Sequence, residues 1–385
     1  MKYLYSFLSL ALLFGSCAQA QSKGNIFTKI RAKFRSEITV GSYAYKNGAI
    51  YFGELNRKRP DGWGKTIYKN GDLYEGEFRR GNRQGFGILK SVDGEKYEGE
   101  WKNDEQNGWG NYYYLNNNHY SGEWINNKQE GEGSMFYHNG DRYIGIWKDN
   151  KRQGEGTYTW LNGAEYSGDW FDDKKHGYGT IKWDDGSSYK GTWKNDSRDG
   201  RGVFVYLHGD KYIGDWVDDV QHGKGVYEFS SGDRYEGAYL NGERTGVGIY
   251  HHANGDKYVG QFKDGMQHGK GVFSWENGAV YEGEWKDNNR HGYGEYKWSN
   301  GDTYEGEWRD NKPNGKGLLK LESGGYFKGT FVDGLEEGHG VQVDKEGNRA
   351  EGNFKEGKRE GEFVETDADG KLIRNGTYVK GRLRS

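Results

Sequence analysis

The sequence predicts an all-β fold, an elongated single sheet of consecutive antiparallel β-hairpins. Three observations support this prediction. A tyrosine recurs every 23 residues from Tyr51 to Tyr304 without insertion or deletion. Glycines stand at fixed positions after these tyrosines, and so does an aromatic residue in every repeat but the first, which has Leu55. Within each repeat they alternate with polar residues at a period of two, which is typical of strands with one apolar and one polar face.

The composition suits a repeat protein whose apolar surface comes from aromatic rings. The chain has 385 residues, of which 66 are Gly and only 2 are Pro. Its mean hydropathy of −1.11 would by itself favour disorder. However, 31 Tyr and 14 Trp supply large apolar surfaces that disordered chains lack. We therefore expect an ordered array held together by contacts between neighbouring repeats.

Positions in the repeat are counted here from its tyrosine, which is offset 0. Glycine stands at offset 2, an aromatic residue at offset 4, a glycine pair at offsets 11 and 13, and a turn glycine at offset 20. This pattern predicts two strands joined by a polar connection at offsets 6 to 10, with a second turn at offset 20. We expect the glycines at offsets 2, 11 and 13 to let rings lie over the backbone. In the repeat that begins at Tyr97 these positions hold Gly99, Trp101, Gly108 and Gly110, and Asn117 replaces the turn glycine.

Residues 41–378 form the predicted array, and basic segments flank it. In residues 21–40 apolar side chains recur at helical spacing among basic ones, which predicts a short helix near residues 25–38 that caps the first hairpin. Anchoring at a membrane surface is the alternative for this segment. Residues 379–385 form a basic tail. The apolar positions of the N-terminal segment are Ile26, Phe27, Ile30, Phe34 and Ile38.

Residues 1–20 have the features of a secretory signal, with a positive start, a short apolar stretch and an A-x-A site that ends at Ala20. The alternative is lipidation of Cys17, which follows a loose lipoprotein box. Both readings predict export to the periplasm, the cell envelope or the medium of a bacterial cell. Cys17 is the only cysteine, so cleavage after Ala20 leaves no cysteine for a disulfide.

The net charge of −3 is unevenly distributed. Residues 21–40 carry +4 and residues 371–385 carry +5, so that residues 41–370 carry −13. An acidic body of this kind disfavours nucleic acid and anionic headgroups. We therefore expect no nucleic-acid partner, and membrane contact only through the basic ends or a lipidated Cys17.

The repeat resembles the MORN repeat (membrane occupation and recognition nexus), as in the sequence YEGEWKDNNRHGYGEYKWSNGDT of residues 281–303. The resemblance implies an antiparallel β-hairpin solenoid used for protein interaction, dimerisation and sometimes membrane association. MORN arrays also precede the catalytic domain of plant phosphatidylinositol phosphate kinases, but nothing in this sequence supplies that domain. The Trp-rich choline-binding repeat of cell-wall proteins differs in its aromatic doublets and spacing.

Nothing in the sequence indicates an enzyme, a cofactor or a metal site. Four histidines share offset 10, but adjacent repeats would hold them about 10 Å apart, too far to share one metal ion. We expect the protein to bind a protein partner, or a second copy of itself, along an aromatic trough. A glycan-binding module of the envelope and a membrane-associated protein are the alternatives. The candidate interaction face consists of Tyr158, Trp160, Tyr166, Trp170, Trp183, Tyr189, Trp193, Tyr206, Trp216, Trp275, Trp285, Trp298 and Trp308.

The export hypothesis predicts that the envelope form begins at Gln21, because cleavage follows Ala20. Intact-mass measurement of the protein from its native envelope checks this. A mass that corresponds to a chain beginning at an acylated Cys17 would instead make it a lipoprotein.

Overall fold

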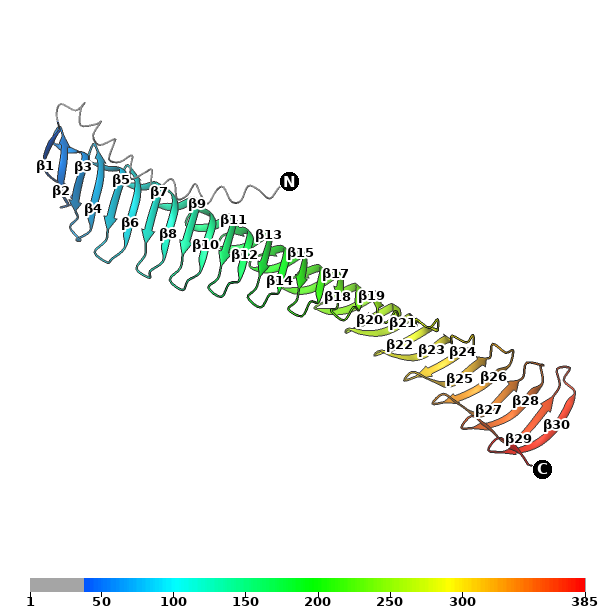
Figure 1. Ribbon diagram of the computed structural model, residues 1–385. Coiled ribbons are helices and arrows are strands. Elements are labelled where there is room, and N and C mark those ends of the chain that lie inside the picture. The colour runs from blue at the N-terminus through cyan, green and yellow to red at the C-terminus, as the bar shows by residue number, and fades with distance from the viewer. Residues whose placement is uncertain (1–37, 385) are drawn as a thin grey trace, which may run out of the picture. The chain divides into compact units, whose positions relative to one another are not determined.

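The computed structural model describes residues 38–384, and every regular element in this part of the chain is a β-strand (Figure 1). The signal segment with Ala20 and Cys17 and nearly all of the expected helix at residues 25–38 lie outside it, so those expectations stay predictions. The described residues include no helix long and apolar enough to cross a membrane. They divide into two units, and the boundary in the sequence lies between Leu161 and Asn162.

Unit 1 covers residues 38–161 and unit 2 covers residues 162–384. The strands of unit 1 are β1 (Thr39–Ala44), β2 (Ile50–Asn56), β3 (Arg59–Ile67), β4 (Leu73–Arg79), β5 (Asn82–Lys90), β6 (Lys96–Lys102), β7 (Glu105–Tyr113), β8 (His119–Ile125), β9 (Lys128–Phe136), β10 (Arg142–Lys148) and β11 (Lys151–Thr159).

The strands of unit 2 continue the same alternation of seven-residue and nine-residue strands over most of its length. They are β12 (Glu165–Phe171), β13 (Lys174–Lys182), β14 (Ser188–Lys194), β15 (Ser197–Val205), β16 (Lys211–Val217), β17 (Val220–Glu228), β18 (Arg234–Leu240), β19 (Glu243–His251), β20 (Lys257–Lys263), β21 (Met266–Ser274), β22 (Val280–Lys286), β23 (Asn289–Lys297), β24 (Thr303–Arg309), β25 (Lys312–Lys320), β26 (Tyr326–Val332), β27 (Leu335–Val343), β28 (Arg349–Lys355), β29 (Lys358–Thr366), β30 (Leu372–Val379) and β31 (Arg382–Leu383).

Within each unit every strand pairs antiparallel with its neighbours in the sequence. In β6 and β7, Gly99 lies opposite Gly110, and in β7 and β8 the same Gly110 lies opposite Gly122. The glycines at offsets 2 and 13 therefore form a line across the sheet. The predicted open antiparallel array of consecutive hairpins is confirmed.

The turn inside each hairpin is tighter than the sequence suggested. Asn103 and Asp104 at offsets 6 and 7 have φ angles of 52° and 71°. Two successive residues with positive φ form a type I′ turn, whose twist matches that of the flanking strands. The expected connection through offset 10 is wrong, because Asn and Asp tolerate this conformation and close the hairpin in two residues. Residues 105–107 belong to β7.

The turn residue at offset 7 also joins successive hairpins. The Asp104 carboxylate accepts a hydrogen bond from the backbone N–H of Arg83, in the preceding hairpin, at 2.8 Å. The Asn127 side chain accepts one from the N–H of Gln106 at 2.9 Å. An Asp or Asn at this position therefore both allows the turn and satisfies a donor of the neighbouring repeat.

A β-bulge interrupts each hairpin after offset 2, as at Gly99 and Trp101. The glycine at offset 11 lies at this bulge, and Gly108 has a φ of 97°. A Cβ on Gly108 would lie 2.3 Å from the Glu100 carboxylate rather than against a ring. The expectation that offset 11 makes room for a ring is therefore wrong. This glycine is needed for the bulge conformation, and the carboxylate at offset 3 packs beside it.

Tyrosines at offset 0 and aromatic residues at offset 4 form the buried ring row of each unit. Tyr97 and Trp101 are almost fully buried and meet edge to face, with ring centroids 5.1 Å apart. Trp101 also meets Tyr74 of the preceding repeat edge to face at 5.3 Å. Its indole N–H donates to the carbonyl oxygen of Gly87 in that repeat at 3.1 Å. Each ring at offset 4 thus links two hairpins by packing and, for most Trp, by a hydrogen bond.

The tyrosine ring packs directly on the backbone of the paired glycines. A Cβ on Gly110 would lie 2.4 Å from the Tyr97 hydroxyl oxygen, and a Cβ on Gly99 would lie 2.4 Å from the Cα of Gly110. The Tyr97 hydroxyl donates to the carbonyl oxygen of Glu100 at 3.0 Å. The expected role of offsets 2 and 13, to let a ring lie over the backbone, is confirmed.

Replacing Gly191→Val is expected to destabilise unit 2 by roughly 1–3 kcal/mol, because overpacking displaces the ring beneath it. A Cβ at Gly191 would meet the Cα of Gly202 and the Tyr189 hydroxyl oxygen, both at 2.5 Å. The control Lys190→Val changes the exposed neighbour and should stay within about 0.5 kcal/mol of the parent. Urea unfolding followed by circular dichroism measures both; equal losses would mean that the two faces are assigned the wrong way round.

Candidate functional site

The face of the sheet that carries the buried ring row also carries three further rows of side chains. Cross-strand pairing places offset 15 opposite the offset-0 tyrosine, as Tyr112 opposite Tyr97, and offset 9 opposite the offset-4 ring, as Gln106 opposite Trp101. Offset 17 follows two residues after offset 15 and lies beside it, with the Tyr112 and Tyr114 centroids 4.5 Å apart. We call this side of the sheet the ring face.

The structure divides the thirteen predicted interaction residues into two groups. Seven stand at offsets 0 and 4 and are at most 6% exposed, so they cannot contact a partner while the array is folded. The other six stand at offsets 15 and 17 and are half-buried, with ring surface open to solvent. The buried seven are Tyr166, Trp170, Tyr189, Trp193, Trp216, Trp285 and Trp308. The half-buried six are Tyr158, Trp160, Trp183, Tyr206, Trp275 and Trp298.

In unit 2 the residues at offsets 15 and 17 form one continuous series of rings, which we call the open ring row. Neighbouring centroids lie 4.4–5.9 Å apart from Trp183 to Trp298. All members are half-buried. The row consists of Trp183, Phe204, Tyr206, Tyr227, Phe229, Tyr250, His252, Phe273, Trp275, Tyr296 and Trp298.

The predicted set omitted most of this row. Tyr227, Phe229, Tyr250, Phe273 and Tyr296 belong to it but were not named as interaction residues. The signal that finds them is the recurrence of rings at offsets 15 and 17 across five successive repeats. Within unit 1 the same offsets bring Tyr158 against Trp160 at 4.7 Å.

Arginine side chains at offset 9 lie over these rings. The Arg198 guanidinium carbon is 4.2 Å from the Trp216 ring centroid and 5.1 Å from that of Phe204. Arg290 lies 5.0 Å from the Tyr296 centroid. Cation–π attraction holds each guanidinium against the ring face, and Arg198 also forms an ion pair with Asp219 at 2.8 Å. The open ring row is therefore bordered by positive charge at several repeats.

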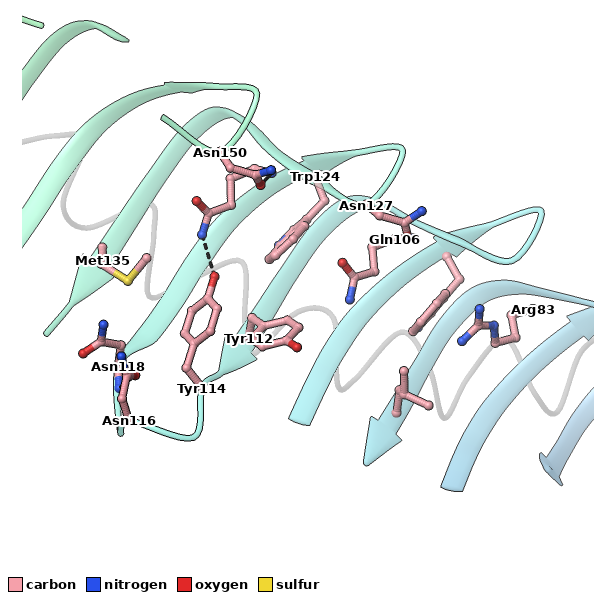
Figure 2. A pocket seen from close by; sticks show the side chains of 13 residues that line it. Arg83, Gln106, Tyr112, Tyr114, Asn116, Asn118, Trp124, Asn127, Met135 and Asn150 are labelled. Atoms are coloured by element: carbon pink, nitrogen blue, oxygen red, sulfur yellow. Dashed lines mark hydrogen bonds between the residues drawn. The ribbon is translucent and has the colours of Figure 1, made fainter. Parts of the chain in front are cut away.

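At two repeats where offset 9 holds glutamine, the amide donates to a tyrosine hydroxyl at offset 17. Gln221 Nε2 donates to the Tyr206 hydroxyl oxygen at 3.0 Å in unit 2. In unit 1, Gln129 Nε2 donates to the Tyr114 hydroxyl oxygen at 2.8 Å (Figure 2). These bonds connect one repeat to the next and fix the orientation of rings that have open surface.

Carboxylates at offset 21 lie on the other side of the open ring row. The Tyr250 hydroxyl donates to the Asp233 carboxylate at 2.8 Å, and the backbone N–H of Ala253 donates to the same carboxylate at 2.8 Å. The backbone hydrogen bond is the main reason that the pKa of Asp233 is lowered. Burial, helped by the bond to Asp233, raises the pKa of Tyr250 to about 12.

The ring face of unit 1 contains a groove of about 690 Å³. Figure 2 shows side chains from successive hairpins converging on it, with Tyr112 beside both Tyr114 and Trp124. Arg83 lies at one end, and its guanidinium carbon is 4.0 Å from the Trp101 ring centroid. The lining is therefore aromatic and amide-rich with one cation. No cluster of three or more potential metal-ligating side chains occurs in residues 38–384.

This geometry defines a class: a repeat protein of consecutive antiparallel hairpins that buries one row of rings and leaves a second row open. The MORN repeat family profile matches thirteen consecutive segments between residues 74 and 371, and the chain belongs to this family. The matched segments are 74–96, 97–119, 120–142, 143–165, 166–188, 189–209, 212–234, 235–257, 258–280, 281–303, 304–326, 327–349 and 351–371. No curated protein sequence matches the chain significantly.

Similar solved structures include the TCP domain of SAS-4 (dCPAP) from Drosophila melanogaster, in complex with a proline-rich motif of Ana2 (dSTIL). It is 14% identical, covers 46% of this chain and 90% of its own, and has a TM-score of 0.27. The TCP10 domain of Danio rerio CPAP, in complex with a STIL peptide, is 10% identical, covers 77% and 98%, and has a TM-score of 0.25. At these scores the likenesses support no inference about the ligand of this chain.

The buried tyrosines predict that the array loses stability at alkaline pH. Burial raises the pKa of Tyr235 to about 12, against about 10 for an exposed phenol. Because the folded pKa is the higher one, the stabilisation is complete below pH 10 and is lost as the pH rises through 12. Phenolate absorbance at 295 nm should show exposed tyrosines ionising near pH 10 and the buried class only above it, together with loss of the strand signal in circular dichroism. Ionisation of every tyrosine near pH 10 would contradict the buried ring row.

Proposed function

We propose that this protein is an exported, non-catalytic scaffold that binds an extended segment of a protein partner along the ring face. The observation that carries the proposal is the open ring row of unit 2, a continuous series of half-buried rings from Trp183 to Trp298. Contiguous apolar surface of this extent is uncommon on a soluble protein unless it serves binding. The secretory signal predicted from residues 1–20 supports export.

The period of the repeat suits an extended polypeptide. Two strand spacings of about 4.8 Å advance the ring face by roughly 10 Å per repeat. A polyproline II segment returns the same side of the chain every three residues, after about 9.3 Å. Successive repeats can therefore contact equivalent side chains of the ligand, and aromatic grooves are a common receptor for this conformation.

The polar groups of the ring face set the chemistry of the partner. Backbone N–H and C=O groups of the central strands are paired within the sheet, so recognition depends on side chains. The rings favour apolar and proline residues, while Arg244 and Arg290 over those rings favour interspersed carboxylates. We therefore expect the bound segment to be extended, apolar and acidic.

The triple change Trp183→Ala, Trp275→Ala and Trp298→Ala tests this function. Truncation of an aromatic hot-spot residue costs about 2 kcal/mol, which is about 30-fold in affinity. The parent protein, immobilised and exposed to native envelope extract, should retain a protease-sensitive partner that the triple variant loses. Titration of that purified partner, followed by tryptophan fluorescence, measures the loss of affinity.

The matched control is Tyr178→Ala with Tyr293→Ala, which removes two exposed rings at offset 12 on the opposite face. This variant should bind as the parent does, and circular dichroism should show that all three proteins are folded. Two results would overturn the proposal. One is polysaccharide retention in affinity electrophoresis that the triple variant loses. The other is sedimentation of residues 38–385 with anionic liposomes at physiological salt.

A further inference from the structure

The first hairpins of unit 1 expose an apolar patch on the face opposite the ring face, which we call the outer patch. Trp63, Phe86 and Trp109 occupy offset 12 in three successive repeats, and each is more than 40% exposed. Phe52 and Val40 extend the row toward the first strand and are 50% and 84% exposed. Soluble proteins rarely leave aromatic side chains exposed in such a series without a partner.

Carboxylates accompany the three rings at offset 12. Cross-strand pairing places Glu77 opposite Trp63 and Glu100 opposite Phe86. Glu123 lies opposite Trp109 in the same way. The carboxylates are oriented by the β-bulge, since the N–H of Trp63 donates to Glu54 at 3.2 Å and the N–H of Phe86 donates to Glu77 at 3.4 Å.

This combination is confined to the start of the array. In unit 2 the residues at offset 12 include Arg201, Lys224, Lys270 and Lys316, and no two neighbouring repeats there both have an aromatic residue. A sequence of three ring and carboxylate pairs is complementary to a partner that is both apolar and basic. Rings accept the apolar side chains, and cations can lie between a ring face and a carboxylate.

We propose that residues 21–37 of this same chain cover the outer patch. The segment carries five basic residues, one acidic residue and apolar side chains at helical spacing, so its composition complements the patch. It joins the described residues immediately before β1, at the end of the sheet where the outer patch begins. Covalent attachment gives it a high effective concentration there.

The dimensions agree with this assignment. Six strand spacings of about 4.8 Å separate β1 from β7, which carries Trp109, and amount to about 29 Å. Seventeen residues in a helix extend about 26 Å. A helix of this length therefore spans nearly the whole row, and it leaves only about 3 Å of the distance from β1 to β7 uncovered. Basic residues at this end of the chain would then serve the fold of the protein, independently of any ligand on the ring face.

Cysteine accessibility tests the proposal, because a chain that begins at Gln21 contains no cysteine. Lys65→Cys places a thiol in the outer patch, opposite Phe52, and Glu295→Cys places one at the same offset 14 in unit 2. Both positions are exposed in the described structure. Alkylation rates are compared in chains that begin at residue 21 and at residue 38, with circular dichroism to confirm that each is folded.

Residues 21–37 should slow alkylation at Lys65→Cys about tenfold, which corresponds to about 1.4 kcal/mol, and leave Glu295→Cys unchanged. Protection should be independent of protein concentration. Changing Lys29, Arg31, Lys33 and Arg35 to Glu should restore the rate of the shorter chain. Equal rates in the two chains, protection that disappears on dilution, or equal protection at both thiols would overturn the proposal; protection lost on dilution would assign the patch to a second copy.

Discussion

The structure depends on the packing of a tyrosine ring onto a pair of glycines. In a single-layer sheet no second layer exists to bury the apolar face, so burial has to be achieved within the sheet itself. The ring of Tyr97 lies over Gly99 and Gly110, and Trp101 then meets it edge to face. This arrangement explains why the protein is rich in glycine and poor in aliphatic residues. A side chain at either glycine would occupy the volume that the ring needs.

The same constraint explains why the ring face is available for binding. Rings at offsets 0 and 4 are enclosed by backbone and by the next repeat, whereas rings at offsets 15 and 17 have neighbours only alongside and beneath them. Trp275, for example, meets Phe273 and Tyr296 but keeps part of its surface exposed. The arginines over these rings place positive charge on this face. The open ring row therefore has arginines along one side and the carboxylates of offset 21 along the other.

Sequence reasoning predicted the repeat accurately and the details of its connections less well. The alternation of Tyr97, Gly99 and Trp101 predicted a strand and its buried face, because side-chain direction in a strand is local. The predicted length of the turn was wrong, since two residues, Asn103 and Asp104, are enough to close the hairpin. Gly108 was assigned to ring packing but occupies a bulge. Both errors arise because glycine and asparagine permit several backbone conformations, and the partner strand selects among them.

The sequence by itself determined the repeat, the order of the strands, the family and the identity of the rings that pack on glycine. Only the tertiary structure decided which aromatic residues stay open, because exposure depends on what the neighbouring repeat contributes. Trp193 and Trp183 have the same chemistry, yet Trp193 lies between Tyr189 and Tyr166 while Trp183 has Phe204 on one side. The positions of the arginines over the rings were likewise set by cross-strand register. The period of the sequence determines on which face of the sheet a residue lies, whereas contacts between repeats determine how deeply that residue is buried.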